Sequence, residues 1–161
     1  FPGSTIGNFT PPEALEFLRG AARLLGPGGA VLVGVDLRKA KALLDAAYDD
    51  PQGVTAEFNL NLLARINREL GADFNLSRFR HQAFYDPVLG RIEMHLESAV
   101  RQSVTVAGQR FEFGEGETIH TENSYKYSVE EFQALAVRAG FRPTRVWTDA
   151  QTLFAVHALA A

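Results

Sequence analysis

The sequence predicts an α/β fold, and three observations support this prediction. A capped helical pattern at residues 11–25 leads into a continuous apolar run at residues 30–35, and a helix followed by a buried strand is typical of an α/β crossover. From Phe79 onward the pattern changes to the alternation and hairpins of antiparallel strands. A second capped helix and a strand pair close the chain. We therefore expect the two ends to form one α/β sheet, with an insertion between them.

The first helix and strand have clear limits. Thr10-Pro11-Pro12-Glu13 has the order of a capping box with proline at the first helical positions, and it predicts a helix that starts near Pro11. The glycine-rich stretch 26–29 ends that helix. The apolar run 30–35 is typical of a strand buried on both faces of a parallel sheet. Asp36 follows at the carboxyl end of the strand, where open α/β sheets bind ligands, although it could equally cap the next helix.

The remaining elements follow from periodicity and turn residues. Two helices are separated by an Asp/Pro/Gly turn, the middle strands alternate with a period of two, and Ser128 opens a second capping box. The expected elements are helices at 38–47 and 55–70, strands at 91–97, 103–106 and 110–113, a helix from 128 to 139, and strands at 144–147 and 153–159.

Composition restricts the class of function. The chain has 161 residues, and its 16 Lys+Arg and 19 Asp+Glu give a net charge of −3 without a basic run, so no nucleic-acid or membrane partner is expected. No cysteine is present, which excludes disulfides, thiolate zinc sites and a cysteine nucleophile and fits a cytoplasmic protein. Because the chain opens on Phe1 without an initiator methionine, we expect it to be a piece of a longer protein.

Two stretches carry unusual chemistry. Residues 1–9 combine glycines with Ser, Thr and Asn before a helix. This composition suits either close approach of the backbone to a ligand or a plain strand-to-helix turn. A phosphate-binding loop would need a lysine, and this stretch has none. In residues 121–127, alternation places Glu122, Ser124 and Lys126 on one side of an extended segment. A carboxylate and a hydroxyl on one face could bind both ring nitrogens of an imidazole, and the alternative is a solvated edge strand.

Other candidate sites are weaker. His120 and Glu122 share a strand face, but two ligands are too few for a metal site, and no metal is expected. No nucleophile elbow of the kind found in hydrolases occurs. The remaining large apolar residues are interpreted as core rather than as a cofactor site; they are Met94, Phe58, Phe79, Phe84 and Trp147.

Several motifs together resemble one known family. They are Phe-Pro-Gly-Ser-Thr-Ile-Gly-Asn (1–8), Ala-Tyr-Asp-Asp (47–50), Gly-Val-Thr-Ala-Glu-Phe-Asn (53–59), Ile-Asn-Arg-Glu-Leu (66–70), Ile-Glu-Met (92–94) and Thr-Glu-Asn-Ser-Tyr-Lys-Tyr (121–127). In this order they resemble the C-terminal half of the histidine-specific, S-adenosylmethionine-dependent methyltransferases. The closing helix, Ala-Gly-Phe and strand pair likewise resemble the end of class I methyltransferases.

The resemblance implies a fold and an activity. It implies the C-terminal part of a Rossmann-like class I methyltransferase sheet, in residues 1–37 and 128–161, with an inserted α+β substrate-binding domain in residues 38–127. Enzymes of this family trimethylate the α-amino group of L-histidine to hercynine in ergothioneine biosynthesis. Most of the S-adenosylmethionine site is expected upstream of this chain, which is therefore expected to be inactive alone. The oligomeric state stays open.

The resemblance also implies roles for individual residues. Asn8 matches the asparagine that holds the amino and carboxylate end of the substrate, and Tyr48 matches the tyrosine that binds the carboxylate. Met94 matches a methionine placed against the substrate. Gly3 corresponds to the junction of substrate and methyl donor. The family's pair that recognises the imidazole corresponds to Glu122 and Ser124. Three alternatives remain: a non-catalytic amino-acid-binding module, a methyltransferase acting on another amino-acid derivative, and a plain interaction domain.

Overall fold

A computed structural model describes residues 1–161 and divides the chain into two compact units, each of which is described by itself. Unit 1 comprises residues 1–40, 86–91 and 123–161, and unit 2 comprises residues 41–85 and 92–122. The helices are η1 (Thr5–Asn8), α1 (Pro11–Leu25), α2 (Lys41–Tyr48), α3 (Val54–Leu70), η2 (Leu76–Arg78) and α4 (Val129–Arg138). The strands are β1 (Ala30–Asp36), β2 (Phe79–Asp86), β3 (Arg91–Ser98), β4 (Gln102–Val106), β5 (Gln109–Phe113), β6 (Thr118–Tyr125), β7 (Arg142–Thr148) and β8 (Phe154–Ala160).

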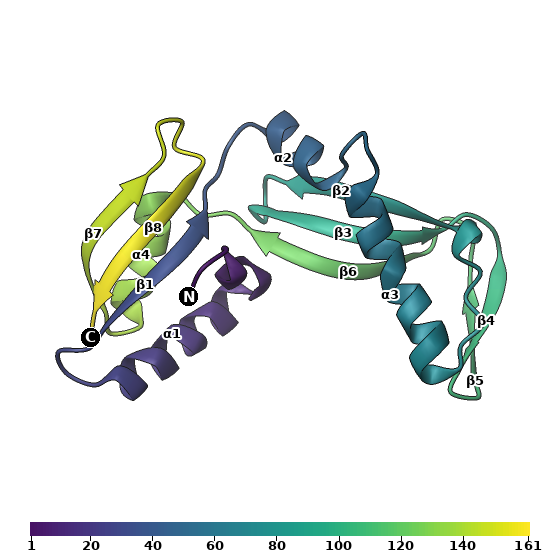
Figure 1. Ribbon diagram of the computed structural model, residues 1–161, viewed down its shortest axis with the longest axis horizontal. Coiled ribbons are helices and arrows are strands. Elements are labelled where there is room, and N and C mark those ends of the chain that lie inside the picture. Colours follow the sequence, from purple (N-terminus) through teal and green to yellow (C-terminus); the bar gives the residue numbers. More distant parts are fainter. The chain divides into compact units, whose positions relative to one another are not determined.

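Unit 1 is a three-stranded sheet covered by two helices (Figure 1). The strand order is β1-β8-β7, and the buried residues of β1 and β8 form one cluster with those of α1 and α4. Both helices begin with the predicted capping boxes, in which Thr10 pairs with Glu13 and Ser128 pairs with Glu131. These caps satisfy N–H groups that the first helical turn leaves without partners, so both helix starts are set locally by the sequence.

The direction of β1 differs from the prediction of a parallel sheet. β1 pairs antiparallel with β8, from Ala30 opposite Ala160 to Asp36 opposite Phe154. It is also not buried along both faces, because Leu32 is 55% exposed. A continuous apolar run indicates that a strand is hydrophobic but not in which direction it pairs. That direction depends on β8, which lies more than a hundred residues further along the chain.

Unit 2 is built around the sheet β2-β3-β6, with the hairpin β4-β5 as a separate sheet (Figure 1). Leu63 of α3 packs with Phe79 and Leu96 of the sheet, and Leu44 of α2 packs with a second cluster that contains Met94. The turn between β4 and β5 has positive φ at Ala107 and Gly108. No helix in either unit has the length and apolar character needed to cross a bilayer.

Three aromatic residues predicted to lie in the core lie at the surface instead. Phe58 is exposed on α3, while Phe84 and Trp147 are exposed on strands. Phe84 stacks on the ring of His95, and the Arg145 guanidinium lies over the Trp147 ring, 4.8 Å from the ring centre. Phe79 and Met94 are buried as predicted.

Candidate functional site

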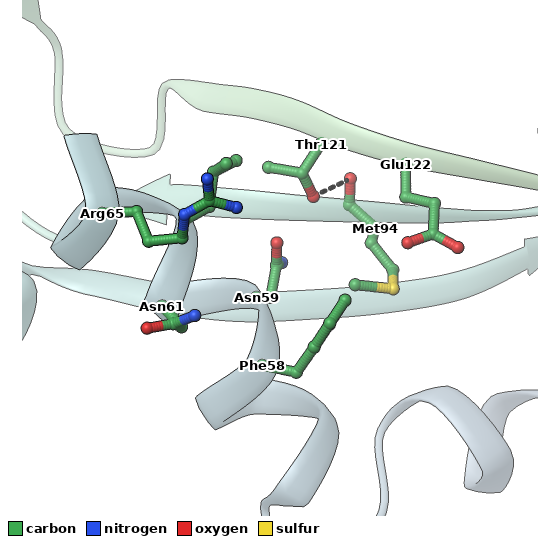
Figure 2. Close-up of a pocket in the computed structure, with 8 residues that line it drawn as sticks. Phe58, Asn59, Asn61, Arg65, Met94, Thr121 and Glu122 are labelled. Carbon is green, nitrogen blue, oxygen red and sulfur yellow. Dashed lines mark hydrogen bonds between the residues drawn. The ribbon is translucent and has the colours of Figure 1, made fainter. Parts of the chain in front are cut away.

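A cavity of about 200 Å³ opens in unit 2 between α3 and the strands β3 and β6. Figure 2 shows the side chains of Asn59, Met94 and Glu122 turned toward this space from those three elements. Glu122 is the only carboxylate among the lining residues, and Arg65 is the only cation. The eight residues that line the cavity are Phe58, Asn59, Asn61, Leu62, Arg65, Met94, Thr121 and Glu122.

A side-chain hydrogen bond joins the strands that carry Met94 and Glu122 beside the cavity. The Thr121 hydroxyl donates a hydrogen bond to the Met94 carbonyl oxygen over 3.0 Å, as Figure 2 shows. Because Thr121 precedes Glu122 directly, this bond fixes the backbone at the base of the Glu122 side chain. The charge of Arg65 is paired with Glu69, because the Arg65 Nε donates to Glu69 over 3.2 Å and this pair raises the pKa of Arg65.

Asn59 connects the cavity to the end of α2. Asn59 is 3% exposed, and its amide nitrogen lies 3.1 Å from the His95 carbonyl oxygen and 3.0 Å from His81 Nδ1. An amide nitrogen donates only, so His81 Nδ1 accepts and the ring proton sits on Nε2. His81 Nε2 then donates to the Tyr48 carbonyl oxygen over 2.8 Å. This chain of bonds holds the backbone of Tyr48.

The turn after Tyr48 is held by a carboxylate. Asp50 accepts hydrogen bonds from the N–H groups of Val54 and Thr55 at 3.0 and 2.8 Å, at the start of α3. The bonds that Thr55 and Val54 donate lower the pKa of Asp50 to about 2. Tyr48 itself packs against the cluster that contains Met94. Hydrogen bonds and packing therefore hold the α2–α3 turn, including Tyr48, in one conformation.

In unit 1, the segment before α1 rests on the end of β6. Gly3 has φ +72, a backbone conformation that favours glycine, and Ser4 Oγ accepts a hydrogen bond from the Asp36 N–H over 2.8 Å. A Cβ atom on Gly7 would lie 2.7 Å from the Tyr125 carbonyl oxygen, so only glycine fits there. Asn8 follows immediately, at the end of η1, and is exposed.

The end of β6 is buried rather than solvated. Ser124 is 5% exposed and Lys126 is 2% exposed, although β6 is an edge strand of its sheet. Lys126 Nζ lies 2.8 Å from Ser124 Oγ and 2.8 Å from Asp36 Oδ2, while Lys39 Nζ lies 2.6 Å from Asp36 Oδ1. Asp36 therefore binds two lysines and does not cap α2, which begins only at Lys41. The solvated-edge alternative is wrong for Ser124 and Lys126.

Three titratable residues of unit 2 lie close together on β3 and β6. Glu93, His95 and His120 can place one donor atom each within 4.8 Å of the others. His95 Nε2 already lies 3.0 Å from Glu93 Oε2, and the His95 and His120 rings are stacked with centroids 4.4 Å apart. Stacked rings direct their nitrogen lone pairs in parallel planes, so this arrangement does not point both rings at a single ion. His120 Nε2 donates to the Glu122 carbonyl oxygen instead.

The structure thus places the predicted residues in two groups. Tyr48, Met94 and Glu122 belong to unit 2, where Met94 and Glu122 line the same cavity. Gly3, Asn8 and Ser124 belong to unit 1. Sequence reasoning missed Asn59 and His81, although Asn59 ends one of the motifs quoted above, and an asparagine on the inner face of a helix is itself a signal of a buried hydrogen-bond network.

Comparison with known proteins bears on the whole chain. A family model described as histidine-specific methyltransferase, SAM-dependent, matches residues 1–161. The histidine N-alpha-methyltransferase of Mycolicibacterium smegmatis is 48% identical over 151 residues, which are 92% of this chain and 47% of that protein. The histidine N-alpha-methyltransferase of Mycobacterium tuberculosis is 46% identical, again over 92% of this chain and 47% of that protein. The chain spans about half the length of these curated relatives.

A solved structure supports the fold. The CcbJ methyltransferase from Streptomyces caelestis matches with a TM-score of 0.50 and 16% identity, over 99% of this chain and 58% of that chain. At this identity the likeness concerns the fold alone, and it confirms the prediction of a methyltransferase-like α/β fold. The family resemblance carried by the sequence motifs is confirmed by the match over all 161 residues. The chain belongs to the family of histidine-specific, S-adenosylmethionine-dependent methyltransferases.

Proposed function

We propose that this chain supplies the substrate-binding part of an enzyme that transfers methyl groups from S-adenosylmethionine to the α-amino group of L-histidine, giving hercynine. One observation carries this proposal. Glu122 brings a single carboxylate into the cavity of unit 2, and the Ser124 hydroxyl follows two residues later on the same strand. A carboxylate and a hydroxyl are the complement of the two nitrogens of an imidazole ring.

The other site residues would hold the rest of the substrate. We assign Tyr48 to the carboxylate of L-histidine, Asn8 to its amino and carboxylate end, and Met94 to an apolar contact in the cavity. Asn8 is exposed and so open to a ligand, and the backbone of Tyr48 is fixed by His81. Neither side chain is a strong base, so these residues would orient the amine rather than take its proton.

S-adenosylmethionine supplies the methyl group when it is bound. Of the residues in this chain, Gly3 fits a contact with it, because its φ of +72 and lack of a side chain leave the backbone open. We propose that residues outside this chain provide most of the cofactor site. The part played by this chain is to hold the α-amine in line with the methyl group, and an amine attacks only in its neutral form.

The pocket residues would also set specificity. A phenylalanine ring could not form the hydrogen bonds that an imidazole would form with Glu122 and Ser124, and the loss of such a bond in a closed site costs about 1 to 3 kcal/mol. We therefore expect the enzyme to discriminate strongly between L-histidine and apolar amino acids of similar size.

The test is to express the complete reading frame that contains this chain and to incubate the product with S-adenosylmethionine and each standard amino acid. Mass spectrometry should find up to three methyl groups added to histidine and none added to the others. A product with a different amino acid would overturn the assignment of the substrate. Binding of histidine without any methylated product would favour the amino-acid-binding module instead.

A further inference from the structure

Lys126 is a buried cation to which the proposed methyl transfer assigns no role. Its side chain is the largest of those that are fully buried, with 2% of its surface exposed. A buried ammonium needs partners, and its Nζ has two of them at 2.8 Å, namely Asp36 Oδ2 and Ser124 Oγ. One of these partners, Ser124, is a residue that we assign to the substrate.

The chemistry of the ammonium group determines the direction of the hydrogen bond to Ser124. An ammonium has three protons and no lone pair, so Lys126 donates and Ser124 Oγ accepts. A hydroxyl has only one proton, which must then point away from Lys126. Asp36 is itself bound by two lysines, with Lys126 at Oδ2 and Lys39 at Oδ1.

We propose that Lys126 is a positioning residue that makes Ser124 a hydrogen-bond donor, so that the enzyme selects the neutral imidazole of L-histidine over the imidazolium. This inference rests on the proposed function, in which Glu122 and Ser124 bind the ring. A neutral imidazole offers one N–H, which suits Glu122, and one lone pair, which suits a donating Ser124. An imidazolium carries two N–H groups, and one of them would meet the proton of Ser124 with the charge of Lys126 behind it.

The charged groups around Lys126 come from several elements. Asp36 ends β1, Lys39 follows it, and Arg38 Nε donates to the Lys126 carbonyl oxygen over 3.3 Å. Arg91 of β3 donates to the Tyr125 hydroxyl over 2.6 Å. The imidazole of free histidine changes charge between about pH 5.5 and 8. The histidines of unit 2, His81, His95 and His120, are the same for every substrate, so a pH dependence that differs between two substrates comes from the substrate ring.

The test compares two substrates of the complete gene product across that pH range. One is L-histidine, and the other is 1,2,4-triazolylalanine, whose ring stays neutral. The KM for histidine should rise by up to about tenfold for each pH unit below about 6.5, while the KM for the triazole should not. Effects on the α-amine are common to both substrates and cancel in the ratio of the two KM values.

Three variants locate the effect. Lys126→Met keeps a long side chain without the charge, and it should flatten the pH dependence of the KM ratio. Lys39→Met is the matched control, because it removes the other lysine bound to Asp36 and leaves Ser124 unchanged. The pH dependence of the KM ratio should then be the same as in the unmodified enzyme. In a Ser124→Ala background, Lys126→Met should change the pH dependence no further, because Lys126 acts through Ser124.

Each outcome is decisive. If the unmodified enzyme shows the same pH dependence for histidine and for the triazole, the inference is wrong, and this comparison needs no variant to fold. If Lys126→Met folds and keeps the original dependence, the inference is wrong as well, while histidine methylation at about pH 8 still supports the proposed function. Failure of the unmodified enzyme to methylate histidine would overturn both.

Discussion

The Glu122 carboxylate is the residue on which the proposed recognition of the imidazole ring can be tested most directly. It is the only negative charge among the residues that line the cavity, and Thr121 holds its backbone in place. Glu122→Gln keeps the size of the side chain and removes the charge, so the KM for L-histidine should rise by at least about tenfold, with a smaller change in kcat. Steady-state kinetics on the complete gene product measure both.

A matched change elsewhere separates this effect from a general loss of charge. Glu112 lies on β5, is exposed and pairs only with Arg110 among charged groups. Glu112→Gln should leave the KM for histidine as it is. Equal kinetics for Glu122→Gln and Glu112→Gln would contradict the role of Glu122 and favour the plain interaction domain.

Tyr127 gives a second prediction at the residue scale, on stability. Its hydroxyl is buried without a hydrogen-bond partner, and burial, helped by Tyr125 and Glu131, raises the pKa of Tyr127 from 10.0 to about 12. The folded state therefore holds this proton more tightly than the unfolded state. The resulting stability is present below about pH 10 and is lost as the pH rises from about 10 to 12.

Tyr127→Phe should remove the loss of stability between about pH 10 and 12. At neutral pH the free energy of unfolding should be unchanged or higher by up to about 1 kcal/mol, because the variant no longer buries a hydroxyl without a partner. Urea unfolding followed by circular dichroism at about pH 7 and about pH 11 measures both effects. A variant that is markedly less stable at neutral pH would show that the hydroxyl does have a stabilising partner.

At the scale of elements, the sequence predicted what depends on neighbouring residues. The start of α1 at Pro11 and the start of α4 after Ser128 follow from capping boxes within four residues of the chain, and both are confirmed. The start of α2 was predicted three residues too early. Asp36, the residue that could have capped it, is bound to Lys126, 90 positions further along, and no local pattern contains that contact.

The candidate site was predictable to the same extent. Motif residues identified Met94 and Glu122, which the structure brings to one cavity. The relay through Asn59 and His81 joins residues 22 and 33 positions apart, so it depends on how α3 packs against β2 and could not be derived from either motif. The binding roles of the individual residues stay predictions.

The packing of η1 against β6 leads to a prediction at this scale. Gly7 faces the Tyr125 backbone so closely that a Cβ atom would lie 2.7 Å from its carbonyl oxygen. Gly7→Ala must therefore shift either η1, which carries Asn8, or β6, which carries Ser124. We expect the KM for histidine to rise by about tenfold or more, because orientation of the substrate is lost.

A second glycine provides the control for that experiment. A Cβ atom on Gly114 would meet only Glu117 Oε2, at an ordinary 3.6 Å. Gly114→Ala should therefore leave the kinetics as they are. A Gly7→Ala enzyme with unchanged KM would mean that neither element contributes to substrate binding.

At the scale of the whole molecule, the chain has separate hydrophobic cores. The cluster that contains Leu18, Val33 and Phe132 lies entirely within unit 1. The cluster around Leu63 and Phe79 lies entirely within unit 2. Each unit thus buries its own apolar surface, and the free energy that protects each set of strands from opening should depend mainly on its own core.

This separation is testable with a reciprocal pair of cavity-forming changes. Leu18 and Leu63 are both almost completely buried, so Leu18→Ala and Leu63→Ala should each cost about 2 to 5 kcal/mol. Hydrogen exchange followed by mass spectrometry should show faster exchange in β1 and β8 for Leu18→Ala, and in β2 and β3 for Leu63→Ala. Because no cluster is shared, the strands of the other unit should keep their protection. Equal acceleration in both sets of strands by either change would mean that the two cores open as one cooperative unit.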